Sequence, residues 1–388
     1  MYVSTLTGRS YRATQGIEIV RRLRPAPENL PSTLRDAVQY RKSGLSLNHV
    51  VGCPLDCGYC VRHLFANYDM KRPHVVMSDE EAVAALVNHW AFRPGATPIQ
   101  IFNRATDPFL PIVKDHLFRT LEELDRRQLT NQVLIITRWR VTPADVARLE
   151  RLCHIRLTIL VTWSGITDQR IEPADSGIAE RSLEVLNRHV RRTKIIFYWR
   201  PLIAGLNDTD AHLACARELG KLAHATVFTG LFFRDEIRRH FRMIGVEDLY
   251  DEVARRKIFP EAVERRVLEA FGGQILFRKT SCGVGFAHGV ADYNGHYGIR
   301  EICDICPTGQ VKLCAAAHRR PSLEEVEALA GLAGLGGETI EIDDRRIAVS
   351  NSAEQQRYFI QHSLNYQVHD RALPHLERRH GRAEVGWP

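Results

Sequence analysis

The stretch CPLDCGYC, residues 53–60, decides the fold, because it places three thiols on eight consecutive residues. It follows the apolar run Leu45–Val51 and precedes a segment of helical character that begins at Val61. Three thiolates on one tight loop between a strand and a helix favour a single metal site. A cubane iron–sulfur cluster usually takes four cysteines, so three leave one iron open to an outside ligand. Zinc with His63 as a further ligand, or buried structural thiols, remain alternatives for this loop.

Outward from this loop, β-rich runs alternate with amphipathic helical patterns from residue 45 to about 280. This alternation is typical of repeated βα units and a parallel sheet. About six units predict an α/β fold, a partial (β/α)6 TIM-like barrel whose chemistry lies at the carboxyl ends of its strands. A doubly wound open sheet would give a similar pattern. The predicted strands are Leu45–Val51, Pro98–Phe102, Gln132–Thr137, Leu157–Thr162, Lys194–Trp199 and Thr226–Phe232, with Gln274–Phe277 as a further candidate.

The predicted helices carry clear start signals. Ser78 and Glu81 form a capping box, and Thr142 followed by Pro143 places a capping hydroxyl before a proline in the first turn. Apolar residues recur at helical spacing between Val113 and Leu124. Two further helices are predicted at 178–190 and 210–222.

Four more cysteines follow the predicted barrel. The chain has nine cysteines and begins without the pattern of a secretory signal, which favours metal ligation over disulfides. The spacing Cys-x20-Cys-x2-Cys-x7-Cys is compatible with a second [4Fe–4S] cluster or with structural zinc. Cys153 and Cys215 lie in apolar contexts and are expected to be buried structural thiols. The four residues of this second set are Cys282, Cys303, Cys306 and Cys314.

The first loop resembles the radical S-adenosylmethionine superfamily, in its cysteine spacing and in the aromatic residue before the last cysteine. The resemblance implies that Cys53, Cys57 and Cys60 hold a [4Fe–4S] cluster, with S-adenosylmethionine on the open iron. An electron from such a cluster cleaves the sulfonium to give a 5′-deoxyadenosyl radical. By the same resemblance, Tyr59 approaches the adenine.

The run NRATDPF, residues 103–109, resembles the Asn-x-Thr-Asp-Pro motif of the spore photoproduct lyase-like branch of that superfamily. It departs from the Gly-Gly-Glu-like turn that the superfamily commonly carries after its second strand. The branch motif implies that Asn103, Thr106 and Asp107 bind the methionyl ammonium. Asp107 before a proline is equally a turn signal.

Two later segments, 170–173 and 200–208, also resemble this branch, and the resemblance spans about residues 45 to 230. It implies that Thr162 and Ser164 lie near the ribose and that Arg181 lies near the carboxylate of S-adenosylmethionine. An arginine in this part of a helix is otherwise a solvated charge.

Four regions follow from these patterns: an N-terminal extension (1–44), the partial barrel (45–280), a cysteine-rich metal-binding extension (281–320) and a small C-terminal α/β tail (321–388). The tail is predicted to be a helix (Leu323–Leu332), a hairpin around Asp343-Asp344 and a second helix from about Ala353 to Tyr366.

Bulk composition is that of a globular protein with a sizeable core, since 44% of the residues are hydrophobic and 26% are charged. No apolar run is long enough for a membrane span, so we expect a cytoplasmic protein without a membrane partner. The net charge of +7 is compatible with nucleic acid as a partner, or with charges that are simply solvated.

The sequence thus predicts a radical S-adenosylmethionine enzyme that modifies or repairs a nucleic-acid base or nucleotide, with a flavodoxin or ferredoxin as electron donor. The lyases of the resembled branch use an extra cysteine near the substrate, and neither Cys153 nor Cys215 is placed for that role. Alternatives are an enzyme acting on a peptide or small metabolite, and a non-catalytic metal-bearing protein that binds nucleic acid.

Overall fold

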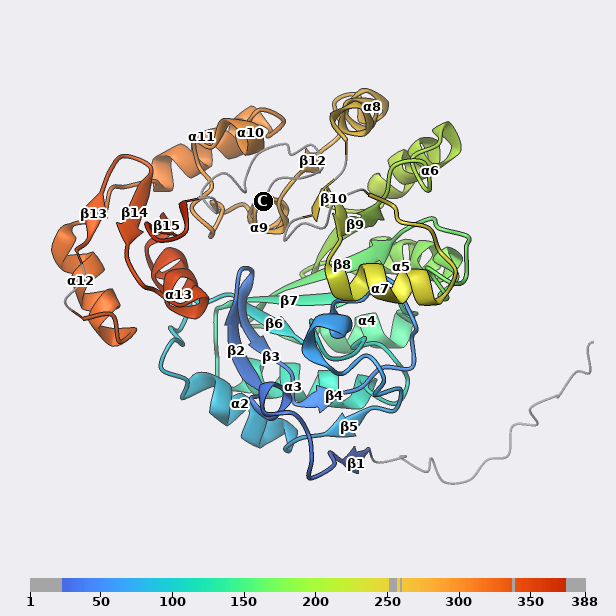
Figure 1. Ribbon diagram of the computed structural model, residues 1–388, viewed down its shortest axis with the longest axis horizontal. Helices are drawn as coiled ribbons and strands as arrows, with labels where there is room; N and C mark the ends of the chain where they lie inside the picture. The colour runs from blue at the N-terminus through green and yellow to red at the C-terminus, as the bar shows by residue number, and fades with distance from the viewer. Residues whose placement is uncertain (1–22, 251–256, 259, 337–338, 375–388) are drawn as a thin grey trace, which may run out of the picture.

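The computed structural model describes residues 23–250, 257–258, 260–336 and 339–374 (Figure 1). A nine-stranded sheet forms its centre, in the order β11-β10-β9-β8-β7-β6-β3-β2 with β12 also paired to β10. The central strands are β3 (Gly44–Leu47), β6 (Ile99–Ile101), β7 (Gln132–Thr137), β8 (Arg156–Trp163), β9 (Lys194–Leu202) and β10 (Ala225–Phe232), all parallel.

The edges of this sheet are short strands. At one edge β2 (Val38–Arg41) pairs antiparallel with β3, and at the other β12 (Leu276–Phe277) runs parallel to β10 while β11 (Lys257–Ile258) runs antiparallel to it. The six predicted strands and the further candidate are therefore confirmed as parallel strands. Within the described residues the sheet stays open, as expected for a partial barrel.

The first predicted strand, Leu45–Val51, was wrong in its length. It breaks at Asn48 and His49, and β4 (Val50–Val51) leaves the sheet to pair with β5 (His74–Val75), which also pairs with β1 (Arg24–Pro25). Both polar side chains are buried and bonded: Asn48 donates to Ser46 Oγ, and the ring of His49 lies 2.8 Å from Asp79 Oδ1. The break in the strand thus coincides with two buried polar side chains, one bonded locally and one bonded to a residue of α2.

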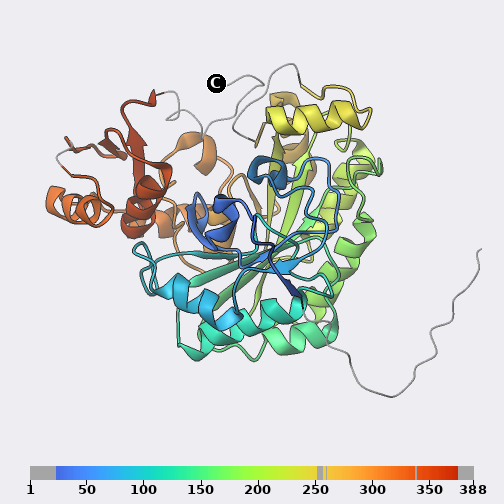
Figure 2. The ribbon, with the colours of Figure 1, turned by 60° about the horizontal axis from the view of Figure 1, so that its bottom comes forward.

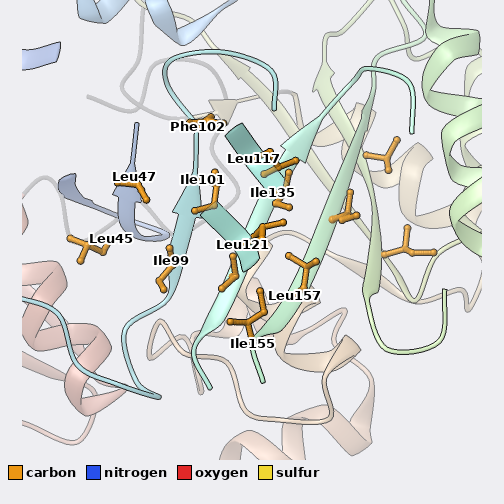
Figure 3. Close-up of a cluster of buried hydrophobic side chains, with 14 of the residues drawn as sticks. Leu45, Leu47, Ile99, Ile101, Phe102, Leu117, Leu121, Ile135, Ile155 and Leu157 are labelled. Atoms are coloured by element: carbon orange, nitrogen blue, oxygen red, sulfur yellow. The ribbon is translucent and has the colours of Figure 1, made fainter. Parts of the chain in front are cut away.

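Helices cover one face of the sheet, and their start signals are confirmed. Ser78 and Glu81 complete a capping box, as do Thr142 and Asp145. Apolar side chains of the sheet pack against Leu117 and Leu121 of the helix Lys114–Arg126 (Figure 3). The helices of this layer are α2 (Asp79–Val87), α3 (Lys114–Arg126), α4 (Pro143–Leu149), α5 (Ser176–His189) and α6 (Asp210–Gly220).

The other face of the sheet is partly covered by the cysteine-rich region. Alternate residues of the strands, such as Leu160, Ile196 and Val227, form a separate apolar cluster that includes Cys282. Helix α9 (Thr280–Ala287) lies so close that a Cβ on Gly283 would meet Val227 Cγ2 at 2.7 Å. The cysteine-rich region therefore packs on the face that would line a closed barrel.

Further short helices connect these layers. They are α1 (Ser32–Arg35), the 3-10 helix η1 (Val61–Phe65), α7 (Asp235–Met243), α8 (Glu261–Phe271), α10 (Arg300–Cys303) and α11 (Thr308–Ala317). Within the described residues no helix is both long and apolar enough to cross a membrane.

The C-terminal tail forms a small module beside β2 (Figures 1 and 2). The predicted helix, hairpin and helix are confirmed, and a strand parallel to the hairpin is added. The elements are α12 (Leu323–Leu332), β13 (Glu341–Ile342), β14 (Arg346–Val349), α13 (Glu354–Leu364) and β15 (Gln367–Asp370). Residues 1–22 of the predicted extension and 375–388 of the tail lie outside the described residues.

His362 of α13 joins this module to two other regions. Its Nε2 lies 2.6 Å from Asn294 Oδ1 and 3.2 Å from the carbonyl oxygen of Lys42, so Nε2 carries the proton. Its Nδ1 then accepts the hydroxyl proton of Tyr40 at 3.1 Å. A buried histidine thereby ties the edge of the main sheet to the loop of the second cysteine set.

Candidate active site

Backbone hydrogen bonds fix both ends of the loop that carries the first three cysteines. The amide of Cys53 donates to the carbonyl of Met70 at 2.8 Å, and the amide of Cys60 donates to the carbonyl of Cys57 at 3.0 Å. Cys53 and Cys57 are buried, whereas Cys60 is half-buried. The helix expected after the loop is the five-residue η1.

Two features hold this loop in place. The guanidinium of Arg62, only 2% exposed, donates to the carbonyl oxygens of Leu55 at 2.9 Å and Asn67 at 3.0 Å. Gly52 has a φ of 100°, and a Cβ there would lie 2.3 Å from the carbonyl oxygen of Arg72. Position 52 therefore requires glycine. Arg62 supplies a buried positive charge that acts on Cys53.

A buried ion pair lies against Cys57. Glu172 Oε1 is 3.7 Å from the Cys57 sulfur, and Glu172 Oε2 is 2.6 Å from Arg138 Nη1. The hydroxyl of Tyr59 bonds both the carboxylate and the guanidinium, and Ser164 Oγ donates to Oε2 at 3.2 Å. Arg138 follows β7, Ser164 follows β8, and Glu172 lies in the loop after β8. The carboxyl ends of two neighbouring strands therefore converge on the cysteine loop.

Burial dominates the electrostatics of these groups. Burial raises the pKa of the Cys57 thiol well above its usual range, with Arg138 opposing this effect and Glu172 adding to it. The pKa of Tyr59 is raised for the same reason. Burial also raises the pKa of the Cys53 thiol, against the influence of Arg62. Each buried thiol thus has one arginine that favours its thiolate.

The loop after β6 contains the residues predicted to bind the ammonium. Asp107 is buried and accepts from Thr137 Oγ1 at 2.7 Å and from the amide of Arg138 at 2.8 Å. Burial raises the pKa of Asp107, while these donors lower it. The amide group of Asn103 bonds Ser46 and Gln100. Within the described residues, the Thr106 hydroxyl is buried without a hydrogen-bond partner.

The residues predicted around the ribose and carboxylate differ in their surroundings. Thr162, on β8, has a buried hydroxyl with no partner among the described residues. Ser164 is 2% exposed and bonds Glu172. Arg181 lies on α5 with its side chain 65% exposed, 3.6 Å from Asp175 Oδ2. The structure brings Thr162 and Ser164 to the carboxyl end of β8. That Arg181 contacts the carboxylate of S-adenosylmethionine stays a prediction.

The four later cysteines gather around Asp292. Cys282 Sγ lies 3.7 Å from Asp292 Oδ1, and the amide of Asp292 lies 3.4 Å from Cys314 Sγ. Burial raises the pKa of the Cys306 thiol to about 12, with Cys303 and Cys314 as its nearest like-charged neighbours. The fold therefore unites residues that are widely separated in the sequence into one second site.

His296 adds a nitrogen donor to this second site. Its Nδ1 is 3.2 Å from Asp292 Oδ1 and 3.9 Å from Cys282 Sγ. The ligand atoms of Cys282, Asp292 and His296 all lie within 4.8 Å of one another. The sequence singled out neither Asp292 nor His296 as a ligand.

A further compact group lies under α2 and α3. His49, Asp79 and His116 also have ligand atoms within 4.8 Å of one another. However, Arg119 Nε lies 2.6 Å from Asp79 Oδ2 and compensates its charge. Although burial opposes ionisation, the hydrogen bonds from the two histidines and the arginine hold the pKa of Asp79 below its usual range. This group is explained as a hydrogen-bonded contact between helices.

The two remaining cysteines lie apart from both sites. Cys153 was predicted to be buried, which was wrong: it is exposed in the turn before β8, with its amide bonded to Asp125. Its apolar neighbour Leu152 is buried instead. Cys215 is half-buried within α6.

No family model and no curated protein matches this chain. Among solved structures, a spore photoproduct lyase double mutant with bound AdoMet and dinucleoside spore photoproduct is 12% identical, with a TM-score of 0.49 over 69% of this chain and 86% of that chain. A single mutant of spore photoproduct lyase is also 12% identical, with a TM-score of 0.48 over 70% of this chain and 88% of that one.

SuiB of Streptococcus suis bound to S-adenosylmethionine is a further similar structure, 9% identical, with a TM-score of 0.40 over 65% of this chain and 54% of that chain. At such identities the likeness concerns the course of the chain, so the chemistry proposed below depends on the site itself.

Proposed function

We propose that the chain is a radical S-adenosylmethionine enzyme, with Cys53, Cys57 and Cys60 holding a [4Fe–4S] cluster and S-adenosylmethionine bound at its open iron. The observation that carries the proposal is the arrangement of three thiols on one closed loop, at the carboxyl edge of a parallel sheet and beside a buried Arg138–Glu172 pair. That edge is where the catalytic residues of βα barrels lie.

The surrounding residues fit such a cluster and cofactor. Thr106 and Thr162, beyond β6 and on β8, each bury a hydroxyl without a partner among the described residues, and a polar cofactor would satisfy both. The three cysteines do not form one of the groups whose ligand atoms all lie within 4.8 Å of one another. Sulfurs on one tetrahedral zinc would be roughly 3.8 Å apart, given Zn–S bonds of about 2.3 Å. A cluster of several irons accommodates the wider spacing.

The protein's own groups prepare the site for this chemistry. Arg62 and Arg138 each favour one thiolate against the cost of burial. Glu172 fixes Arg138 and Tyr59 in one network, so that the ring of Tyr59 keeps one position within the cysteine loop. When bound, the cluster and S-adenosylmethionine supply one-electron chemistry that begins with cleavage of the sulfonium.

For the substrate we propose a nucleic-acid base or a nucleotide. The chain carries a net charge of +7, and the arginine-rich helix α7 lies against η1, where the rings of His63 and His240 are 4.4 Å apart. Basic side chains next to the site would contact phosphates. Because Cys153 and Cys215 lie outside the site, photoproduct lyase activity itself is not part of the proposal. A peptide or small metabolite is the alternative substrate class.

For the second site we propose a fully ligated [4Fe–4S] cluster on Cys282, Cys303, Cys306 and Cys314, with a structural or electron-transfer role. The four cysteines contain no trio of sulfurs within 4.8 Å of one another. Zinc remains the alternative, and the compact trio of Cys282, Asp292 and His296 favours it.

Anaerobic reconstitution tests the proposal. With iron and sulfide, then a ferredoxin or flavodoxin reducing system, the protein should convert S-adenosylmethionine to 5′-deoxyadenosine. Addition of single-stranded DNA labelled with deuterium on the sugar and base should move deuterium into that product. A reduced cluster that leaves S-adenosylmethionine intact would sink the radical assignment, and DNA-bound holoenzyme without activity would favour the non-catalytic alternative.

A further inference from the structure

Two arginines share one aromatic ring beside the cluster loop. The guanidinium carbon of Arg41 lies 4.7 Å from the ring centroid of Phe65, and that of Arg104 lies 5.3 Å from the same centroid. Phe65 is the last residue of η1, and Arg104 lies in the loop after β6, next to Asn103. Arg104 and Phe65 therefore belong to segments of the proposed active site, and Arg41 reaches them from the end of β2.

Neither arginine has an acidic partner in the part of the chain that the structure describes. No carboxylate oxygen there lies within 4.0 Å of either guanidinium, although Arg104 is only 4% exposed and Arg41 is half-buried. Burial and, to a smaller extent, the charge of Arg41 lower the pKa of Arg104 to about 10, while the charge of Asp36 opposes them. Two neighbouring like charges, one buried and one half-buried, are costly when no carboxylate contacts them directly, even with Glu354 and Asp36 farther away. Contact with one ring compensates only a part of that cost.

Uncharged acceptors hold the two guanidiniums in place. Arg104 donates from Nη1 to the carbonyl of Thr33 at 3.0 Å and from Nη2 to the carbonyl of Asp36 at 2.8 Å. Arg41 donates from Nη2 to the side-chain oxygen of Gln39 at 3.0 Å, and the Gln39 amide donates to the same Thr33 carbonyl at 3.1 Å. This chain of bonds fixes both side chains without neutralising them.

Each arginine keeps a buried donor without a partner. The Nε atoms of Arg41 and Arg104 are both buried and unbonded within the described residues. Fixed guanidiniums that lack a directly contacting carboxylate and keep unpaired donors are suited to binding an anion.

We propose that Arg41, Arg104 and Phe65 form the subsite for a phosphate group of the substrate. The inference rests on the proposed function and narrows its substrate to a nucleotide or a nucleic-acid strand. A phosphate has enough oxygens and charge to bridge two guanidiniums, whereas a carboxylate is matched by one bidentate arginine. The subsite lies beside the cluster loop, so a phosphate held there keeps the attached sugar and base near the site.

The test measures binding to the reconstituted holoprotein under anaerobic conditions, by equilibrium dialysis. The probes are inorganic phosphate, a single-stranded 12-nucleotide DNA, acetate and S-adenosylmethionine. Arg41→Gln should weaken phosphate and DNA binding at least tenfold and reduce the salt dependence of DNA binding by about 0.7 in the log–log slope. Arg104→Lys should weaken both by a smaller factor, because it keeps the charge. Arg126→Gln removes the same charge from an exposed residue of α3 and should change nothing.

The outcomes separate this subsite from the proposed function. Unchanged phosphate and DNA affinity in Arg41→Gln would overturn the subsite. A loss of S-adenosylmethionine affinity instead would assign the pair to the carboxylate of that molecule, and acetate binding as tight as phosphate binding would also reject the phosphate assignment. Intact phosphate binding in a holoprotein that never cleaves S-adenosylmethionine would keep the subsite and remove the radical chemistry.

Discussion

The two cysteine sites differ in what surrounds their thiols. The first set lies on one eight-residue loop, near the buried Arg62, the partly buried Arg138, a glutamate and two hydroxyls that have no partner among the described residues. The second set is collected from 33 residues, around Asp292 and His296. Positive charge and open polar groups suit a site that receives a cofactor and a substrate, whereas four thiols with an acid and a histidine suit a closed site. The residues around the thiols therefore distinguish a proposed catalytic site from a proposed closed site better than the number of cysteines does.

The largest effect is expected when one thiol is removed from the first site. Cys57→Ala should abolish cleavage of S-adenosylmethionine, by more than a hundredfold, because a lost ligand exceeds the 10- to 100-fold effects known for outer-shell residues. Product formation by chromatography measures it. Cys153→Ser removes an exposed thiol outside both sites and serves as the matched control. Activity in Cys57→Ala close to that of the control would mean that this loop is not the catalytic one.

The next test concerns the ion pair between Arg138 and Glu172 at the first site. Arg138→Met should destabilise the protein by about 3–5 kcal/mol, since it leaves Glu172 buried and unpaired. Urea denaturation measures this change. The double variant with Glu172→Gln should recover a large part of it. Additive losses in the double variant would show that the two residues do not act as a pair.

At the second site, Cys306→Ala should lower the bound metal while leaving some cleavage of S-adenosylmethionine. A site saturated a hundredfold over its dissociation constant contributes about 2.7 kcal/mol, which is the stability expected to be lost. Metal analysis for iron and zinc, before and after the change, identifies the ion. Complete loss of cleavage with unchanged stability would reverse the roles assigned to the two sites.

Acid should loosen the contact that His362 makes between the C-terminal module and the loop of the second cysteine set. In the unfolded chain a histidine ionises near pH 6.5, whereas burial lowers the pKa of His362 to about 3. Between these values the unfolded state binds the extra proton, so stability falls as the pH decreases below 6.5. At pH 5.5 this contribution is about 1.4 kcal/mol.

Hydrogen exchange around Asn294 at pH 7.5 and pH 5.5 measures that loosening. His362→Gln should be less sensitive to the change of pH, whatever its stability at neutral pH. An equal sensitivity in the variant would assign the acid response to other groups.

Much of the fold could be predicted because its signals are local. Strand alternation, capping residues and cysteine spacing each depend on neighbours a few positions apart, and they located the parallel strands and the helix starts. The break at Asn48 and His49 was hidden, because its cause is the burial of two polar groups against partners elsewhere, such as Asp79. Apolar residues on both sides of them made one continuous strand the simpler prediction.

The candidate site was predictable only in part, because contacts between residues far apart in the sequence leave no local signal. Its thiols were evident from spacing, but the Arg138–Glu172 pair joins residues 34 positions apart across a helix and a strand. An arginine directly after a buried strand was the one available signal for Arg138. Asp292 and His296 were noticeable only as polar residues of the loop between Cys282 and Cys303. Their approach to the thiols could not be predicted, because the loop gains its shape from packing on the sheet.

The hydrogen bond between Tyr40 and His362 has a consequence for synthesis on the ribosome. Its two residues are 322 positions apart in the chain. The edge strand β2 therefore emerges early and lacks this contact until the chain has been made as far as His362. During that interval it is an exposed strand open to pairing with other chains, and chaperones are needed most at this stage. Completion of the C-terminal helix is the event that ends the exposure.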